Sequence, residues 1–165
     1  MKELKKVLVP VDFSPICKKA AHFALMLSEP FNPNVDILHV WDLPPYLGPF
    51  PVVQPVSGPT VALPEYAKNK VEEAMAEFFA ELEQDIEKAQ DKNHFIEVNR
   101  RIETGPPAET IIEVANEGNY DLIVMGTHGR KGIAHLFIGS VAEKVVRGAH
   151  CPVVTVPPTD NNNDK

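Results

Sequence analysis

The residues with the clearest chemical meaning are three glycines and a serine that follow a short apolar run. Gly126, Gly129 and Gly139 are separated by two and by nine residues, and Ser140 directly follows the third glycine. Glycines just past the end of a strand let backbone N–H groups approach an anion closely. A helix that opens at Ser140 adds the free N–H groups and the dipole of its first turn, which favour a phosphate. The pattern therefore predicts a phosphate-binding loop between a strand and a helix.

The charge beside this loop differs from that of the whole chain. Arg130 and Lys131 follow Gly129, whereas the chain has 16 lysines and arginines, 23 acidic residues and a net charge of −7. An acidic chain is a poor candidate for binding a nucleic-acid backbone or an anionic membrane, so we expect neither partner. The loop lacks the Gly-Lys-Ser/Thr ending of a P-loop, and no G-x-G-x-x-G pattern follows the first apolar run. The plain alternative, a glycine-rich turn that only ends a strand, is disfavoured by the combination of three glycines and a serine.

Two kinds of periodicity alternate along the chain and indicate the elements that position this loop. Apolar runs predict five strands, at residues 7–11, 35–40, 95–102, 122–125 and 153–156. Apolar residues at helical spacing predict four helices, at residues 15–28, 65–92, 107–116 and 140–147. Ser14 before Pro15 has the pattern of a helix N-cap, and Ser140 with Glu143 has the pattern of a capping box.

The strict alternation of strands and helices predicts an α/β fold. We expect an open, Rossmann-like sheet of five parallel strands with helices on both faces. Ligands bind such sheets beyond the carboxyl ends of the strands, so functional residues should follow the first, second and fourth strands. Asp12 follows the first strand and has two interpretations: it contacts a ribose or a water on Mg²⁺, or it caps the first helix in competition with Ser14. We favour contact with a ligand because of its position.

The prolines are concentrated in one segment. The chain has 16 prolines, and seven of them lie within residues 43–64, where no residue is charged. We expect this segment to form neither regular sheet nor helix. It is either a surface loop or, because it is rich in apolar residues, a lid or a segment that docks a partner. Residues 1–157 are expected to form a single domain and residues 158–165 a disordered tail.

The N-terminus and the cysteines bear on the compartment. The N-terminal apolar run is too short for a signal peptide or a membrane span, and Cys17 and Cys151 do not make a disulfide framework. A reduced, cytoplasmic protein with two buried, inert thiols is therefore expected. His39, inside the second strand, is interpreted as a histidine whose hydrogen bonds are satisfied in the core. No spacing of histidines with cysteines or carboxylates indicates a metal site.

Several stretches of the sequence closely resemble the universal stress protein family. They are the opening VLVPVDFS, the HVW end of the second strand and the block DLIVMGTHGRKGIAHLFIGSVAEKVVRGAHCPVVTV, and the resemblance covers nearly the whole chain. The glycine spacing is similar to that of the branch whose members bind ATP. The resemblance implies a five-stranded parallel α/β fold, ATP as the ligand with a role for Mg²⁺ left open, and a homodimer paired through residues 153–156.

The resemblance also implies a role for each position that matches the family's motifs. The adenosine side of the site is assigned to Pro10, Val11, Asp12 and Val40, the last of them through its backbone. The ribose and α-phosphate are assigned to Met125, Gly126, His128 and Gly129. The β- and γ-phosphates are assigned to the backbone N–H groups of Gly139, Ser140 and Val141. Arg130 joins the site as a positive charge beside the loop.

Three functions remain open from the sequence. The first is a dimeric, nucleotide-binding regulatory module that signals to a partner under stress. The second is a slow, Mg²⁺-dependent ATPase, but no residue is identified that would position the attacking water, so no catalytic residue is assigned. The third is a ligand-free interaction protein, which the intact glycine pattern disfavours.

Overall fold

The computed structural model describes residues 3–28, 31–42, 52–53, 61–89, 97–127 and 138–158. The strands are β1 (Lys6–Val11), β2 (Asn34–Trp41), β3 (Val52–Val53), β4 (Val61–Ala62), β5 (Val98–Thr104), β6 (Leu122–Gly126) and β7 (Val153–Val156). The helices are α1 (Pro15–Ser28), α2 (Leu63–Ala89), α3 (Pro107–Glu117) and α4 (Ser140–Gly148).

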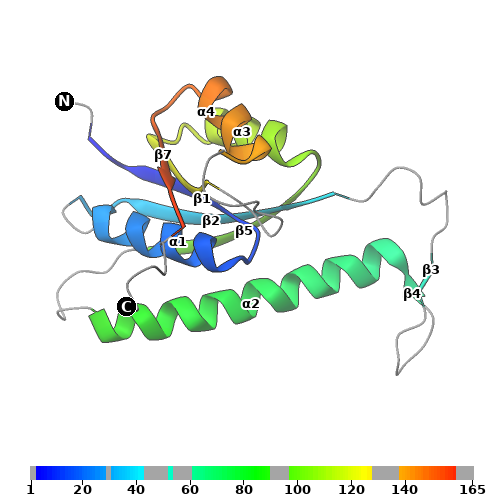
Figure 1. The fold of residues 1–165 in the computed structure, drawn as a ribbon. Helices are drawn as coiled ribbons and strands as arrows, with labels where there is room; N and C mark the ends of the chain where they lie inside the picture. Colours follow the sequence, from blue (N-terminus) through cyan, green and yellow to red (C-terminus); the bar gives the residue numbers. More distant parts are fainter. Residues whose placement is uncertain are drawn as a thin grey trace, which may run out of the picture.

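Five of the strands form one parallel sheet in the order β5-β2-β1-β6-β7. Helices α1 and α2 cover one face of it, and α3 and α4 cover the other (Figure 1). Val7, Val9 and Val11 of β1 belong to the core beneath α1 and α2, whereas Leu8 belongs to the core beneath α3 and α4. Neighbouring residues of a strand point to opposite faces, so a continuous apolar run requires cover on both. The predicted fold class is confirmed.

The observed elements follow the predicted order with small shifts. Helix α1 begins at Pro15 and ends at Ser28, as the N-cap pattern and the apolar periodicity predict. Strand β5 begins at Val98, later than predicted, and residues 95–96 lie outside the described residues. Helix α2 begins slightly earlier than predicted, at Leu63, and residues 90–92 of the predicted helix lie outside the described residues.

The prediction that residues 43–64 form no regular structure is wrong. Val52–Val53 and Val61–Ala62 pair as a two-stranded antiparallel sheet, and α2 begins inside the segment. The paired positions contain no proline, and Pro64 falls in the first turn of α2, where its missing N–H has no intrahelical partner to lose. Residues 43–51 and 54–60 lie outside the described residues, so the lid and docking interpretations stay predictions. The same holds for the tail from residue 159.

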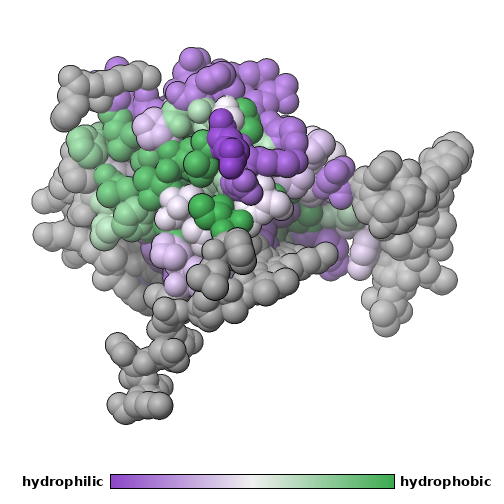
Figure 2. All heavy atoms as spheres, turned by 45° about the horizontal axis from the view of Figure 1, so that its top comes forward, coloured by the Kyte–Doolittle hydropathy of each residue, from purple (hydrophilic) through white to green (hydrophobic). Residues whose placement is uncertain are grey.

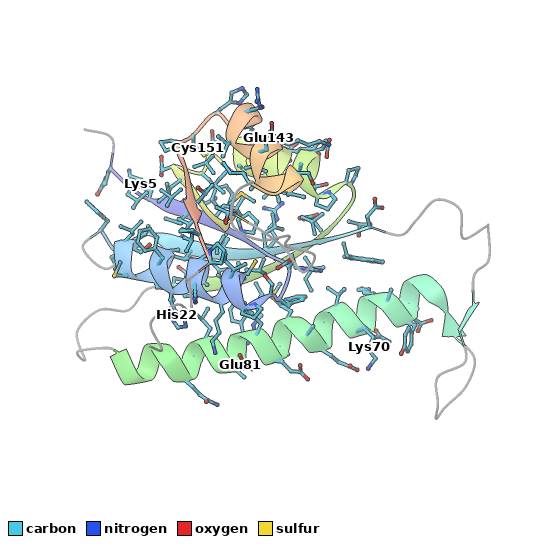
Figure 3. The ribbon with its side chains drawn as sticks, in the orientation of Figure 1. Lys5, His22, Lys70, Glu81, Glu143 and Cys151 are labelled. Atoms are coloured by element: carbon cyan, nitrogen blue, oxygen red, sulfur yellow. The ribbon has the colours of Figure 1, made fainter. Side chains whose placement is uncertain are left out.

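Helix α2 is packed mainly through its second half. Met75, Phe78, Phe79 and Leu82 are buried against α1 and the sheet. The N-terminal part of the helix runs past the carboxyl ends of the strands towards β3 and β4 (Figure 1). Lys18 of α1 donates a hydrogen bond of 3.1 Å to Glu81 of α2. Glu81 is labelled on α2 in Figure 3.

The ladder between β1 and β6 stops short of the carboxyl ends. The two strands pair only at Val7–Leu122 and Leu8–Ile123, whereas β1 pairs with β2 along its whole length. The Lys6 carbonyl accepts a hydrogen bond from the Asp121 N–H, on the β6 side. Alternate residues of a strand direct their backbone groups to the same neighbour, so Pro10 turns a nitrogen without a proton towards β6. The strand order reverses between these two strands, which is where open parallel sheets bind ligands.

Candidate functional site

The chain turns at the end of β1, and Asp12 holds the turn. Asp12 Oδ1 accepts hydrogen bonds from the Ser14 N–H at 3.1 Å and from the Cys17 thiol at 3.0 Å. The Ser14 carbonyl accepts from the Cys17 N–H at 3.0 Å, in the first turn of α1. The carboxylate thus fixes the turn that leads into the helix, whereas its role as the helix cap, the second of the two interpretations drawn from the sequence, stays a prediction. Its contact with a ligand stays a prediction.

The two cysteines lie in different surroundings. Burial, and next the hydrogen bond to Asp12, raise the pKa of the Cys17 thiol to about 11. Cys17 therefore stays protonated near neutral pH, and its predicted burial is confirmed. Cys151 is only partly buried, so the prediction of burial is wrong for this residue. It lies just before β7, which is an edge strand of the sheet that the described residues form.

Phe13 follows Asp12 and has a left-handed backbone conformation, with φ of 63°. Its ring stacks on the ring of His39 in β2, with centroids 4.3 Å apart and an interplanar angle of 24°. His39 Nδ1 lies 2.7 Å from the carbonyl oxygen of Val11. A carbonyl only accepts, so this nitrogen carries a proton and donates it. The prediction that His39 has a satisfied hydrogen bond is confirmed, but the residue is only partly buried and does not lie in the core.

The end of β6 and the start of α4 form the other side of the candidate site. Thr127 is 9% exposed, and its N–H donates to the Val156 carbonyl of β7 at 3.0 Å. Its own carbonyl accepts from the Gly139 N–H at 2.6 Å. This bond returns the chain to the end of β6 and fixes the place where α4 begins. The first-turn N–H groups of α4, which have no intrahelical acceptor, therefore lie at the carboxyl end of the sheet.

The predicted capping box at Ser140 is wrong. The N-cap of α4 is Gly139, with φ of −59° and ψ of 151°, and there is no side-chain hydrogen bond at this cap. Ser140 is already the first helical residue, so its hydroxyl is one position too late to form the box with Glu143. Glu143 instead pairs with Arg147 one turn further on, at 3.2 Å. The Gly139 N–H, assigned to phosphate by the resemblance, is engaged with Thr127, which leaves Ser140 and Val141 as the better donors.

Apolar side chains from four elements lie at or near this end of the sheet. Met125 of β6 is 5% exposed, within the core beneath α3 and α4. Val40 of β2 and Val141 of α4 pack against the same core. Pro10 of β1 is also buried. An apolar surface next to a few polar backbone groups is typical of a small-molecule site.

The described residues of the predicted site come from one end of the sheet. They end β1 and β6, lie near the end of β2, or begin α4: Pro10, Val11, Asp12, Val40, Met125, Gly126, Gly139, Ser140 and Val141. His128, Gly129 and Arg130 lie outside the described residues. Contact of any of these residues with a ligand stays a prediction.

Sequence reasoning misses two residues that shape this region. Nothing in the sequence indicates the left-handed conformation of Phe13, because glycine and asparagine are the residues that favour it. Thr127 is not among the predicted site residues, although it joins β6 to both β7 and α4 through its backbone. His39 was interpreted from the sequence, and the structure adds that it lies opposite Val11 in the parallel register.

Comparison with known proteins decides the family. The sequence model described as the universal stress protein family matches residues 3–157. The chain belongs to the universal stress protein family. A relative, universal stress protein MJ0531 of Methanocaldococcus jannaschii, is 32% identical over 152 residues, which cover 92% of this chain and 81% of the relative.

Solved structures of universal stress proteins share the fold. One from Lactobacillus plantarum has a TM-score of 0.69 at 23% identity, with 94% of this chain and 99% of that chain covered. Another, described as a universal stress protein in complex with cAMP, has a TM-score of 0.64 at 20% identity, with 94% and 98% covered. Within its described ranges, this universal stress protein has no helix that qualifies as a membrane span. The same ranges contain no cluster of three or more potential metal-ligating side chains.

Proposed function

We propose that this universal stress protein is a regulatory module that binds ATP. The observation that carries the proposal is the hydrogen bond from the Gly139 N–H to the Thr127 carbonyl. It brings the first turn of α4 to the carboxyl end of β6, beside the shortened β1–β6 ladder. The N–H groups and the dipole of a helix start favour an anion, and the place where strand order reverses favours a nucleotide.

The proposal assigns ATP to two groups of residues. The ends of β1 and β2 hold the adenosine, and Met125 and Gly126 follow the ribose. The N–H groups of Ser140 and Val141 hold the terminal phosphates, with His128, Gly129 and Arg130 assigned to the phosphate side by their motif. An Mg²⁺ ion carried by the ATP offsets phosphate charge, which favours binding to a chain of net charge −7.

A known relative supports an adenine nucleotide as the ligand class. The related universal stress protein solved in complex with cAMP binds an adenine nucleotide. The long glycine spacing of this chain, with a helix start at its end, offers donors for more than one phosphate group. The first observation favours an adenine nucleotide, and the second favours ATP over a monophosphate.

We also propose that the protein forms a homodimer through β7. The two edges of the sheet differ in chemistry: β5 carries two arginines and a glutamate, whereas β7 consists of three valines and one threonine, all partly buried. Charged side chains protect an edge strand, and an uncharged β-branched edge invites pairing. Ile138 and Val146, which flank or belong to α4, are 49% and 47% exposed. Figure 2 shows apolar side chains gathered on the face that carries β7.

The function is tested on the purified full chain. The protein is denatured and any released small molecule is identified by mass spectrometry, and the native protein is titrated with ATP and with cAMP by calorimetry. Incubation with ATP and Mg²⁺ follows. We expect bound ATP and no sustained release of ADP. Steady ADP release would support the slow ATPase, and no bound nucleotide in any assay would favour a ligand-free interaction protein.

Gly139→Asp separates ligand binding from stability. The backbone angles of Gly139 suit any residue, and an aspartate at an N-cap is better than glycine by a few tenths of a kcal/mol, on the order of 0.3. We therefore expect an unchanged or raised melting temperature. The added carboxylate repels a phosphate, so ATP affinity should fall by about tenfold or more.

Gly139→Ser is the matched control for this prediction. It also supplies a capping oxygen but carries no charge, so it should bind ATP within about threefold of the unsubstituted protein. Equal affinity of the Asp and Ser variants would contradict the assignment of phosphate to the start of α4.

A further inference from the structure

The turn after β1 is fixed by groups to which the proposed function gives no role. Phe13 has φ of 63°, a backbone conformation that bulky side chains rarely adopt. Such a conformation persists only where the surroundings hold it, and it is common at ligand sites. At this turn the surroundings include two aromatic side chains and a hydrogen bond from β2, in addition to the hydrogen bonds that Asp12 makes within the turn.

The two aromatic side chains come from different layers of the molecule. Phe13 stacks on His39 of β2 at 4.3 Å, and its ring centroid lies 6.0 Å from that of Phe78 at a tilt of 58°. Phe78 is 7% exposed and belongs to the packed half of α2. The partly buried ring of Phe13 is thus held between the sheet and a helix, and it loses both ring contacts if it leaves this place.

His39 holds the backbone as well as the ring. Its Nδ1 donates to the Val11 carbonyl at 2.7 Å, and Val11 is the last residue of β1. His39 therefore contacts the residue before Asp12 and the residue after it. Asp12 in turn accepts the Ser14 N–H, so the whole turn from β1 to α1 is tied to one side chain of β2.

We infer that His39 is a positioning residue of the nucleotide site, which acts through Val11 and Phe13 to hold Asp12 and the end of β1 in the shape that receives the ligand. Phe78 extends this support to α2. The inference rests on the proposed function. A turn that is ordered before binding raises affinity, because the ligand need not select a rarely populated conformation.

Three variants of His39 separate the hydrogen bond from the ring. His39→Asn keeps an N–H at the position of Nδ1 and loses the stack, His39→Phe keeps a ring and loses the donor, and His39→Leu loses both. If the competent fraction of the turn falls to about a tenth, the apparent ATP affinity falls by about tenfold. We expect that loss in His39→Leu and a smaller loss in each of the other two variants.

The matched control is Ile37→Val. Ile37 lies on the same strand and in the same core cluster, but it is not among the rings and hydrogen bonds of the turn. The Ile37→Val substitution should lower the melting temperature and leave the ATP affinity of the folded protein unchanged. If ATP affinity fell in proportion to melting temperature in both Ile37→Val and His39→Leu, the inference would be overturned.

Amide hydrogen exchange in the ligand-free protein gives a readout that does not need ATP. The Asp12 N–H donates to Cys17 Sγ at 3.4 Å and the Ser14 N–H donates to Asp12. Both should exchange about tenfold faster in His39→Leu than in Ile37→Val. Absence of ATP binding by the unsubstituted protein overturns the proposed function itself. If His39→Leu binds ATP as tightly as the unsubstituted protein, or if exchange at Ser14 is unchanged, only the positioning role is overturned.

Discussion

Asp12 and Cys17 illustrate how neighbours set the chemistry of single residues. The thiol donates to Asp12 Oδ1 at 3.0 Å, and the same oxygen accepts the Ser14 N–H. Burial is the main reason that the pKa of Cys17 is raised, and the hydrogen bond to Asp12 is the next. A protonated Cys17 is therefore part of the folded turn, and its deprotonation would place a second negative charge beside the carboxylate.

The stability of the protein should fall at alkaline pH because of Cys17. Its pKa rises from 9.0 to about 11 in the folded protein. Below pH 9 both the folded and the unfolded states keep the proton, so the stabilising effect is complete, and it is lost as the pH rises through the folded value. The full loss for two pKa units is on the order of 3 kcal/mol, of which about 1.4 kcal/mol falls below pH 10. Urea unfolding at several pH values up to about pH 10 measures it.

Cys17→Ser should remove this part of the alkaline loss, since a serine hydroxyl can still donate to Asp12 and does not titrate in this range. Cys151→Ser is the control and should keep the loss. Burial also raises the pKa of Tyr120, to about 12, so its own effect begins only above pH 10 and is common to all variants. An unchanged pH profile in Cys17→Ser would contradict the assignment.

Helix α4 shows at the scale of an element how a sequence pattern can be displaced by one residue. The pattern Ser-x-x-Glu predicts Ser140 as the N-cap. In the structure the N-cap is the preceding residue, Gly139, and Ser140 is the first helical residue. The bond from the Gly139 N–H to Thr127 fixes the chain before the helix begins. A tertiary contact therefore decides the cap, and no local pattern records that contact.

Ser140→Ala should change the free energy of unfolding by less than about 0.5 kcal/mol. The side chain is exposed at the first helical position and makes no cap hydrogen bond. If Ser140 were the N-cap, the same substitution would lower the free energy of unfolding by about 1 kcal/mol. Urea unfolding distinguishes the two, with Ala142→Gly in the same helix as a variant that should cost at least about 1 kcal/mol, because it also removes a buried methyl group. A loss of that size in Ser140→Ala would restore the capping box.

Much of the fold was predictable because its elements obey local rules. The continuous apolar run of β1 indicates a strand covered on both faces, and Ser14 with Pro15 marks the start of α1. The site residues at the ends of β1 and β6 follow from the strand order alone. The cap of α4 and the left-handed Phe13 were not predictable, because the cap depends on a contact with Thr127 and the conformation is one that the residue type disfavours. The pairing of β3 with β4 was not predictable because each strand has only two residues, which are too few to show a period.

At the scale of the whole molecule, the two edges of the sheet have different chemistry. Arg100 and Arg101 lie on β5, where Arg100 stacks over Phe79 at 4.3 Å and Arg101 pairs with Glu103 at 2.8 Å. Strand β7 carries no charge at all. Since a free edge with apolar side chains tends to pair, this asymmetry favours one surface of the molecule for self-association.

Backbone direction shows which residue of β7 controls that pairing. The carbonyls of Pro152 and Val156 accept hydrogen bonds from the β6 side, each at 3.0 Å. Since alternate residues face the same neighbour, Thr155 directs its N–H to the open edge. Thr155→Pro therefore deletes an edge donor without removing a bond between β6 and β7, and proline is tolerated on an edge strand.

We expect the unsubstituted protein to be a dimer at micromolar concentration and Thr155→Pro to be a monomer that keeps its melting transition. Thr155→Val is the matched control: it retains the N–H and a β-branched side chain, so it should stay dimeric. Sedimentation equilibrium measures all three proteins. A monomeric unsubstituted protein would rule out the β7 dimer. A Thr155→Pro variant as dimeric as Thr155→Val would instead mean that self-association uses side chains, such as those of Ile138 and Val146, rather than the backbone of the edge.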